Sequence, residues 1–410
     1  MPIYRTPGVY IEEVSTGPRP IEAVGTSTAA FVGGAPSAGA RLDEAVAVNS
    51  WSQFVKEYVT EGSASTPLSH AVFGFFENGG RRCYCVNVAK DQPIRGEGRE
   101  RKGVALLDEI DEINIVAAPG YTDVDSYQAL LAHCEKLRNR VAVLDAPQEV
   151  KDIRMLTEVA TAPSPAKPPR EGAAGAREAG PPKGTGAGGL RPPNSSRGYG
   201  AFYFPWITVQ DPLSPKTLVD VSPSGHIAGI YARTDATRGV HKAPANEAVR
   251  GALNLTYRVT DQEQESLNES GVNCLRFFPR DGILVWGART LTAPGNEWRY
   301  LNVRRLFNMI EESILRSTRW VVFEPNDMSL WKAIRRDLRA FLTRMWRDGA
   351  LMGATPEEAF FVKCDAETNP PEVIDAGQVV TVIGLAPVKP AEFIIFRIGQ
   401  SAAGTEVATT

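Results

Sequence analysis

Apolar residues recur at helical spacing in the last quarter of the chain. Steps of three and four residues place one set on a single helical stripe, flanked by charged residues: Val303, Leu306, Phe307, Ile310, Ile314 and Leu315. A second stripe predicts a helix from about 329 to 348, ended by Gly349, and contains Trp331, Ile334, Leu338, Phe341, Leu342 and Met345. Between these helices the apolar residues 320–323 predict a short strand, and Pro325 then breaks the pattern. Residues 355–358 have the sequence of a capping box, which predicts a third helix start.

The first 290 residues alternate between apolar strands and helices. Strands are predicted at 28–32, 46–48, 83–88, 113–117 and 141–144, and helices at 50–58, 67–77 and 124–137. Further along, the pattern predicts a helix at 222–234 and strands at 253–259, 274–278 and 283–286. Such alternation predicts a mixed α/β fold whose sheet is partly parallel.

Residues 161–200 interrupt this pattern with proline, glycine, alanine and scattered charges. So little apolar surface cannot offset the entropy that ordering would cost. We therefore interpret the segment as a surface loop or flexible insertion.

Each end of the chain carries a short apolar, β-prone run. These runs are Val9, Tyr10 and Ile11 near the start, and Phe393, Ile394, Ile395 and Phe396 near the end. A strand so close to a terminus cannot stabilise itself, so it must pair with a sheet in its own subunit or in a neighbour. The residues alone leave both pairings open.

Composition excludes several classes of protein. A chain of 410 residues is long enough for two or three domains, and 43% hydrophobic with 23% charged residues is typical of a soluble protein. A net charge of -3 without a basic domain gives no indication of nucleic-acid binding. Five cysteines, an odd number, favour reduced thiols. Residues 1–8 lack the features of a secretory signal and no run of 18 apolar residues occurs, so we expect a cytoplasmic protein without membrane insertion.

No catalytic, cofactor or metal site is predicted. Cys83 and Cys85 could form half a metal site, but two cysteines on one strand face explain the spacing better because no second half is present. The glycine-rich residues 184–189 lie in the low-complexity segment, without the strand and helix that a phosphate-binding loop requires. Ser224 and His226 lack the flanking pattern of a nucleophile elbow.

Basic residues gather on the face of helix 329–348 that lies opposite its apolar stripe. They include Lys332, Arg335, Arg336 and Arg339, with only Asp337 and Asp348 as acidic residues among them. The ordinary interpretation is a solvated surface. Cations arranged in this way also repel one another unless anions meet them, which is typical of a docking face for an acidic partner.

Several long runs, in the same order, resemble the contractile tail sheath proteins of phages, R-type pyocins and extracellular contractile injection systems. Four of them lie in the C-terminal block: EWRYLNVRRL (297–306), WVVFEPND (320–327), PEEAFFV (356–362) and APVKPAEF (386–393). The N-terminal YRTPGVYIEE (4–13) and the middle run SPSGHIAGIYA (222–232) are also similar to that family. The resemblance covers most of the chain outside residues 160–200.

This resemblance implies a multi-domain sheath fold. It implies an N-terminal arm at 1–20, an outer α/β part at 21–290 that contains the insertion 161–200, an inner C-terminal domain at 291–388 and a C-terminal arm at 389–410. The implied assembly is a homopolymer of stacked hexameric rings around an inner tube protein, with baseplate and cap proteins at its ends. Such a particle assembles in the cytoplasm and can be released.

Two roles follow for the candidate residues, with one alternative for the whole chain. The arm residues 9–11 and 393–396 would add strands to a neighbour's sheet. The basic face of helix 329–348 would dock on the inner tube through charge. The alternative is an α/β enzyme with an unrecognised nucleotide or small-molecule site, for which the alternating strands are the only support.

Overall fold

The computed structural model describes residues 20–89, 92–96, 101–161 and 188–395. The candidate arm residues Val9, Tyr10, Ile11 and Phe396 lie outside these ranges, as do residues 162–187 of the segment interpreted as a loop or insertion.

A nine-stranded sheet forms the centre of the molecule, with strand order β2-β3-β1-β4-β5-β6-β11-β12-β9. Its strands are β1 (Ala29–Gly33), β2 (Ala45–Val48), β3 (Cys83–Asn87), β4 (Ile115–Ala117), β5 (Val141–Asp145), β6 (Gly200–Phe204), β9 (Glu247–Ala248), β11 (Val272–Phe278) and β12 (Gly282–Val285). The six strands from β3 to β11 run parallel, β2 and β12 pair antiparallel with the outermost two of them, and β9 pairs antiparallel with β12. The predicted α/β layer with a partly parallel sheet is therefore confirmed.

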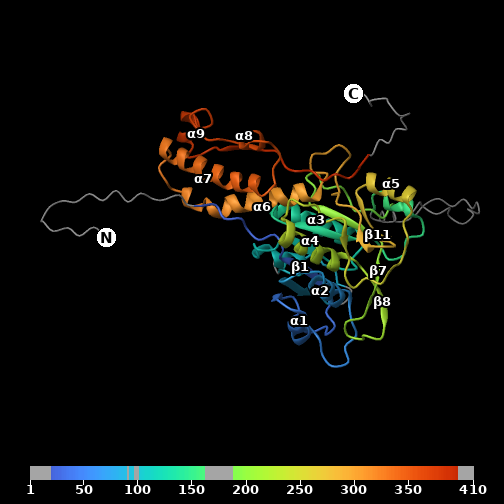
Figure 1. Ribbon diagram of the computed structural model, residues 1–410. Helices are drawn as coiled ribbons and strands as arrows, with labels where there is room; N and C mark the ends of the chain where they lie inside the picture. Colours follow the sequence, from blue (N-terminus) through green and yellow to red (C-terminus); the bar gives the residue numbers. More distant parts are fainter. Residues whose placement is uncertain (1–19, 90–91, 97–100, 162–187, 396–410) are drawn as a thin grey trace, which may run out of the picture.

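Helices cover both faces of this sheet (Figure 1). On β1, Ala29 and Phe31 face one hydrophobic cluster while Ala30 and Val32 face another, as the two-residue period of a strand requires. Helices α2 (Pro67–Glu77) and α4 (Ser224–Arg238) pack in the first cluster, and α3 (Val124–Leu137) and α5 (Asp261–Glu269) in the second. Because both faces are covered, the central strands β1 and β4 are apolar throughout.

The helix pair α2 and α4 packs closely because glycines face it. A Cβ atom on Gly225 would lie 2.3 Å from the Ala71 backbone, and one on Gly74 would lie 2.3 Å from the His226 ring. Helix α1 (Trp51–Tyr58) lies beside α2, and a smaller sheet of β7 (Ile207–Gln210), β8 (Leu218–Val221) and β10 (Asn254–Leu255) lies next to the central layer.

A third hydrophobic cluster organises the C-terminal residues, which form a lobe at the upper left of Figure 1. It contains α6 (Leu301–Ser317), α7 (Met328–Arg347), α8 (Pro356–Ala359) and α9 (Pro371–Asp375), with a two-stranded sheet of β13 (Phe360–Lys363) and β14 (Val382–Leu385). The two helices predicted from apolar stripes are confirmed, and Asp327 caps α7 by accepting from the Ser329 and Leu330 amides.

Three local predictions in the C-terminal lobe and before it are wrong. Residues 320–323 form no strand, because no sheet edge lies there to pair with them; Arg319–Val321 is a 3-10 turn, and Phe323 has a left-handed φ of 70° and is fully exposed. The capping box at Thr355 does not form, since the Glu358 carboxylate accepts from the Ala354 amide and the helix lasts only one turn. The strand predicted at 253–259 is limited to β10.

The segment predicted as an insertion ends earlier than its composition indicates. Arg191 and Tyr199 are buried, and the backbone of Leu190 and Arg191 bonds to Met155 and Glu158. The Ser195 hydroxyl donates to Glu135 at 2.6 Å. Residues 190–200 therefore belong to the packed fold, because a few buried polar anchors compensate for their low apolar content.

Candidate interaction surfaces

The basic face of α7 is partly neutralised within the chain. Arg339 pairs with Glu357 of α8 at 3.2 Å, and the Arg336 Nε donates to Asp337 at 2.9 Å. Arg335 donates to the Cys364 carbonyl at 3.4 Å, while Lys332 is exposed and has no partner within the described ranges. The structure therefore brings the four predicted residues onto one face, and it adds Glu357 as an acid that the sequence did not place there.

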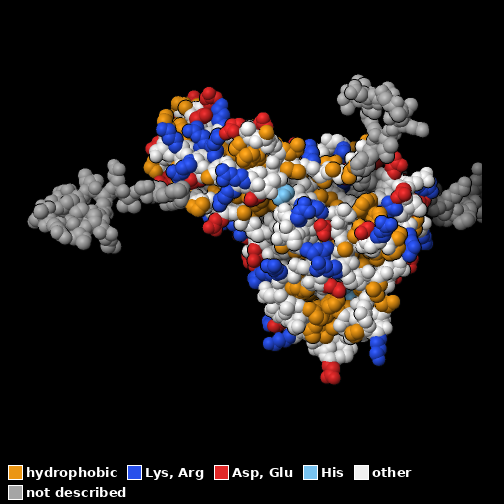
Figure 2. All heavy atoms as spheres, viewed as in Figure 1, with side chains coloured by type: hydrophobic (Ala, Val, Ile, Leu, Met, Phe, Trp, Pro, Cys, Tyr) orange, Lys and Arg blue, Asp and Glu red, His pale blue; other side chains and the backbone are white. Residues whose placement is uncertain are grey.

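This face remains available for a charged partner. The Arg339–Glu357 pair is exposed on both sides, and such pairs contribute roughly 0–1 kcal/mol, so Arg339 can exchange its partner at little cost. Arg336 is half-exposed, but its partner Asp337 is buried. The buried stripe of α7 faces α6 and β13 and leaves the basic residues toward solvent. Lysine and arginine side chains are visible on this lobe in Figure 2.

The two-stranded sheet of β13 and β14 has unpaired backbone edges within the described residues. Phe361 pairs in register with Gly384 and Lys363 with Val382. Phe360 and Val362 face the core of the lobe, whereas Phe361 and Val382 are exposed. An isolated two-stranded sheet is marginal in water, and open edges with apolar neighbours are typical of a strand-accepting site.

The described part of the C-terminal run, Phe393, Ile394 and Ile395, forms no strand in the single chain and has 73 to 78% of its surface exposed. Directly before it, the Glu392 carboxylate receives two hydrogen bonds from the Arg289 guanidinium, at 2.9 Å and 2.6 Å. The internal pairing that the sequence left open does not occur for these three residues.

A buried ion pair joins α6 to the central layer. The Arg305 guanidinium donates to both oxygens of Asp235 on α4, at 2.9 Å and 2.5 Å, and each side chain is only 3% exposed. The Thr26 hydroxyl donates to the same carboxylate at 2.6 Å, and its carbonyl accepts from Arg305. At the start of α6, the Asn302 amide donates to the carbonyls of His241 and Val388. The sequence offered no signal for these contacts, because the partners are 61 to 279 residues apart.

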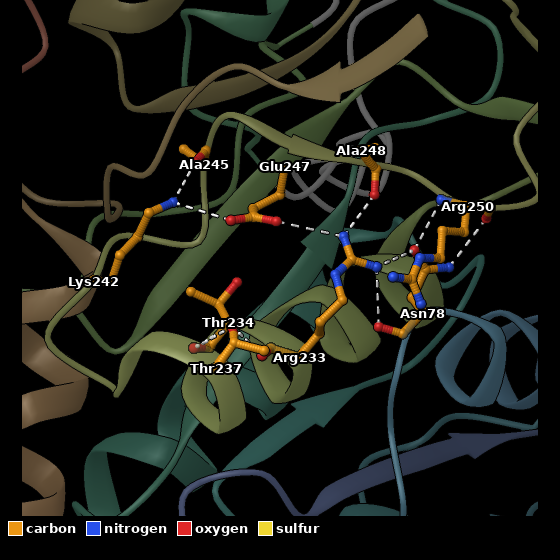
Figure 3. Close-up of polar contacts among 9 residues, drawn as sticks. All are labelled: Asn78, Arg233, Thr234, Thr237, Lys242, Ala245, Glu247, Ala248 and Arg250. Carbon is orange, nitrogen blue, oxygen red and sulfur yellow. Dashed lines mark hydrogen bonds and ion pairs between the residues drawn. The ribbon is translucent and has the colours of Figure 1, made fainter. Parts of the chain in front are cut away.

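A second polar cluster fastens the edge of the central sheet (Figure 3). Arg233 of α4 donates to the Asn78 and Ala248 carbonyls, at 3.2 Å and 2.7 Å, and lies 3.7 Å from Glu247. The Asn78 side chain closes the cluster by bonding to the backbone of Arg250 in both directions. The Arg233 and Asn78 side chains are both used within the fold, so we interpret the cluster as structural.

Ser224 and His226 are buried. The Ser224 hydroxyl and amide both donate to Asp145, whose pKa burial raises to about 6 although these hydrogen bonds favour its charged form. Burial lowers the pKa of His226 to about 4. The hydroxyl donates to a carboxylate, and no opening to solvent reaches it, so this arrangement cannot attack a substrate.

The remaining candidates also have structural explanations. Cys83 and Cys85 are free and buried side by side on β3, and burial raises the pKa of the Cys83 thiol. The described ranges contain no group of three or more His, Cys, Asp or Glu residues that could hold a metal ion. None of the helices in those ranges combines the length and apolar character that crossing a bilayer requires.

Comparison with known proteins identifies a single family over the second half of the chain. Residues 192–291 match the family described as "Phage tail sheath protein central domain", and residues 293–401 match "Phage tail sheath C-terminal domain". The tail sheath protein of Vibrio phage KVP40 is 29% identical over 174 residues, 42% of this chain and 25% of that protein. A putative prophage major tail sheath protein of Pseudomonas aeruginosa is 26% identical over 179 residues, 43% of this chain and 45% of that protein. The match thus spans between a quarter and a half of these curated relatives.

Solved structures match over nearly the whole chain. The sheath complex of the extracellular contractile injection system PVC, in its contracted state, is 30% identical with a TM-score of 0.76, covering 98% of this chain and 99% of that one. The helical sheath of the anti-feeding prophage, also contracted, is 27% identical with a TM-score of 0.72 and covers 97% of this chain and 100% of that one. A chain from the six-fold symmetrised baseplate of the same prophage is 29% identical over 98% of this chain.

Proposed function

Since the chain belongs to the phage tail sheath family, we propose that it is the structural subunit of a contractile sheath that forms stacked hexameric rings around an inner tube. The observation that carries the proposal is the end-to-end likeness to the PVC sheath at 30% identity. In the proposed particle the sheath meets a baseplate at one end and a cap at the other, assembles in the cytoplasm and contracts to drive the tube through a target envelope. The particle is phage tail-like.

The body of the subunit is built to move as one piece. The Arg305–Asp235 pair and the Asn302 bonds connect α6 to α4 and to the segment before β9. Because breaking a buried pair costs several kcal/mol, sliding between subunits is easier than bending within one. Contraction in this proposal is a rearrangement of rigid bodies whose arms act as hinges.

Strand exchange provides the links between subunits. The arms at residues 9–11 and 393–396 would each add a strand to the open edges of a neighbour's β13–β14 sheet. Each added hydrogen bond contributes about 0.5–1.5 kcal/mol, so one link is modest and many links per subunit hold the mesh. The exposure of Phe393, Ile394 and Ile395 supports this exchange.

The two arms leave the body from opposite ends of α6. Ser317 and Ser313, in its last turns, accept from the Glu22 and Val24 amides, while Asn302 in its first turn holds the Val388 carbonyl. At about 1.5 Å per residue, the helix keeps the two exits roughly 20 Å apart. Such a fixed separation suits links to two different neighbours.

Electron microscopy of the purified chain tests the proposal. Tubes or rings are the expected result, and addition of the inner tube protein should increase their number. Monodisperse small particles under every condition, together with turnover of a small molecule, would instead support the enzyme alternative.

A further inference from the structure

The C-terminal arm leaves the body of the subunit beside the Arg289 side chain. From Ala386 onward the described chain forms no further strand, although Pro387 makes an isolated bridge with Leu351 and the Val388 amide donates to the Ala350 carbonyl. Two side chains of the body add to these backbone contacts. The Val388 carbonyl accepts from Asn302 at 3.0 Å, and Glu392 is held by Arg289. The exposed apolar run begins at the next residue, so Glu392 is the last attachment before the arm.

Arg289 is itself firmly fixed. Its amide donates to the Asn273 side chain at 2.7 Å and its carbonyl accepts from the same side chain at 2.8 Å, which ties it to β11 of the central sheet. Its third guanidinium nitrogen donates to the Asn268 carbonyl of α5 at 2.9 Å. The guanidinium is therefore positioned before Glu392 arrives, and it presents a fork that fits a carboxylate at two points.

The Arg289–Glu392 pair is largely shielded from solvent. The side chains of Arg289 and Glu392 are 10% and 17% exposed, and Glu392 lies within 3.4 Å of the Tyr300 hydroxyl. The side-chain hydrogen bond and the charge of Glu392 raise the pKa of Arg289. At that exposure, salt screens the pair much less than it screens a surface pair.

We propose that the Arg289–Glu392 pair is the fixed root of the C-terminal arm and sets the register at which its strand meets the neighbouring subunit. This inference rests on the proposed function, because it assumes that the arm adds a strand to another copy of this chain. Side chains alternate between the two faces of a strand, so a slip of one residue would turn the apolar residues of the arm to the wrong face.

Loss of the pair would move the root back to Val388. Residues 389–392 would then no longer be attached to the body, and they would lengthen the free arm by at most about 13 Å of extended chain. A longer tether lowers the effective concentration of the arm at its acceptor and allows more than one register. Arg289 and Glu392 are thus positioning residues for assembly.

Two matched insertions test the root directly. One serine is inserted between Lys389 and Pro390, before the pair, and in a second variant one serine is inserted between Glu392 and Phe393, after it. If the pair fixes the root, the first insertion is absorbed and leaves polymerisation near normal, whereas the second raises the protein concentration needed for sheaths at least tenfold. Equal effects of the two insertions on sheath formation, measured by sedimentation and electron microscopy, would overturn the proposal.

Substitutions give an independent readout. Glu392→Gln should raise the same threshold concentration at least tenfold, because a neutral amide then replaces the carboxylate that the Arg289 fork holds at two points. Glu372→Gln, at an exposed glutamate of α9 without a partner in the described residues, is the matched control and should change nothing.

Deletion of residues 393–410 distinguishes the role of the arm itself from the role of the Arg289–Glu392 pair at its root. If that deletion abolishes polymerisation while Glu392→Gln and both insertions assemble normally, the arm matters and its root does not. If the deletion also assembles normally, strand exchange by this arm is wrong.

Discussion

At the scale of single residues, the Arg305–Asp235 ion pair connects α6 to α4. Both charges are buried, and the guanidinium also lies 4.7 Å from the centre of the Tyr231 ring. Burying two charges gives little net stability by itself, but it makes either residue hard to replace alone. The pair therefore specifies one orientation of α6 against α4.

We expect Asp235→Ala to lower the free energy of unfolding by about 3–5 kcal/mol, because it leaves Arg305 buried without a counter-charge. The double variant Asp235→Leu with Arg305→Met should recover a large part of that loss. Chemical denaturation of the isolated subunit measures both. A single variant as stable as the wild type would contradict the buried pairing.

His226 predicts a dependence of stability on acid. Its pKa falls from 6.5 to about 4 on folding because of burial, so the unfolded chain binds the proton more readily. The stability it contributes is complete above pH 6.5 and is lost as the pH falls toward 4. Asp145 acts in the opposite direction, because its raised pKa favours the folded state at low pH and this contribution is lost as the pH rises through about 6.

Between pH 6.5 and 4, wild type should therefore lose roughly 3 kcal/mol more unfolding free energy than His226→Gln. Asp145→Asn should instead lose more than wild type, since the offsetting group is removed. Denaturation at several pH values across this range gives, for each variant, the slope of the unfolding free energy against pH. A substitution that lowers the stability equally at every pH leaves this slope unchanged. Parallel curves for wild type and His226→Gln would refute the assignment.

At the scale of elements, α7 combines two faces with different tasks. Its apolar stripe packs on α6 and β13, and its basic face makes one exposed pair, Arg339–Glu357, and one pair to a buried acid, Arg336–Asp337. This division allows the charges to be changed without removing core contacts.

Reversal of Arg335, Arg336 and Arg339 to glutamate should weaken attachment to the tube without unfolding the chain. The melting temperature should fall through Arg336, because the buried Asp337 carboxylate loses its counter-charge. Attachment of the wild type should also fall as salt is raised. Reversal of Lys216 and Arg280, two exposed basic residues elsewhere, is the control. Normal co-assembly with the tube after the triple reversal would show that this face does not meet it.

The segment at 161–200 divides into two parts with different expectations. Deleting residues 163–186 with a Gly/Ser bridge should leave folding and sheath assembly intact, because loop length changes closure entropy only slowly. Extending the deletion to residue 198 removes the hydrogen bonds from Arg191 to the Ser270 carbonyl and from Ser195 to Glu135. Each partner left unsatisfied should lower the free energy of unfolding by about 1–3 kcal/mol. Thermal melting distinguishes the two, and equal melting temperatures would show that residues 190–198 add nothing.

At the scale of the whole molecule, buried polar contacts join the central layer to the C-terminal lobe. The central sheet and the C-terminal lobe share α6, which reaches from the β12 side of the body to the segment that begins the described chain. In the proposed mesh this body transmits force between neighbours, and only the arms need to change direction.

If the N-terminal arm pairs with another subunit as proposed, removing residues 1–14 should leave the melting temperature nearly unchanged and prevent polymerisation. Ile11→Pro and Ile395→Pro should act likewise, since proline removes one ladder donor. Ile395 is 78% exposed, so its replacement removes no core contact, and Ile395→Thr, which keeps the donor, is the control. Normal sheaths from the truncation and from both proline variants would rule out the linked mesh.

Local patterns along the sequence determined most of the elements. Continuous apolar runs gave the strands of the parallel sheet, and stripes at helical spacing gave α3, α6 and α7, because these signals depend on neighbours within a few residues. The runs that resemble sheath proteins also lie within single elements and their adjoining loops. The apolar character of residues 393–396 was likewise evident without the structure.

Only the tertiary structure decided which distant residues meet. Arg289 with Glu392, and Arg305 with Asp235, are pairs separated by 103 and 70 residues, and nothing in the local sequence distinguishes them from other charged residues. The same holds for residues 320–323, which have strand-forming side chains but no sheet edge to join. A strand or a buried ion pair exists only when the fold supplies its partner, so its position is a property of the whole chain.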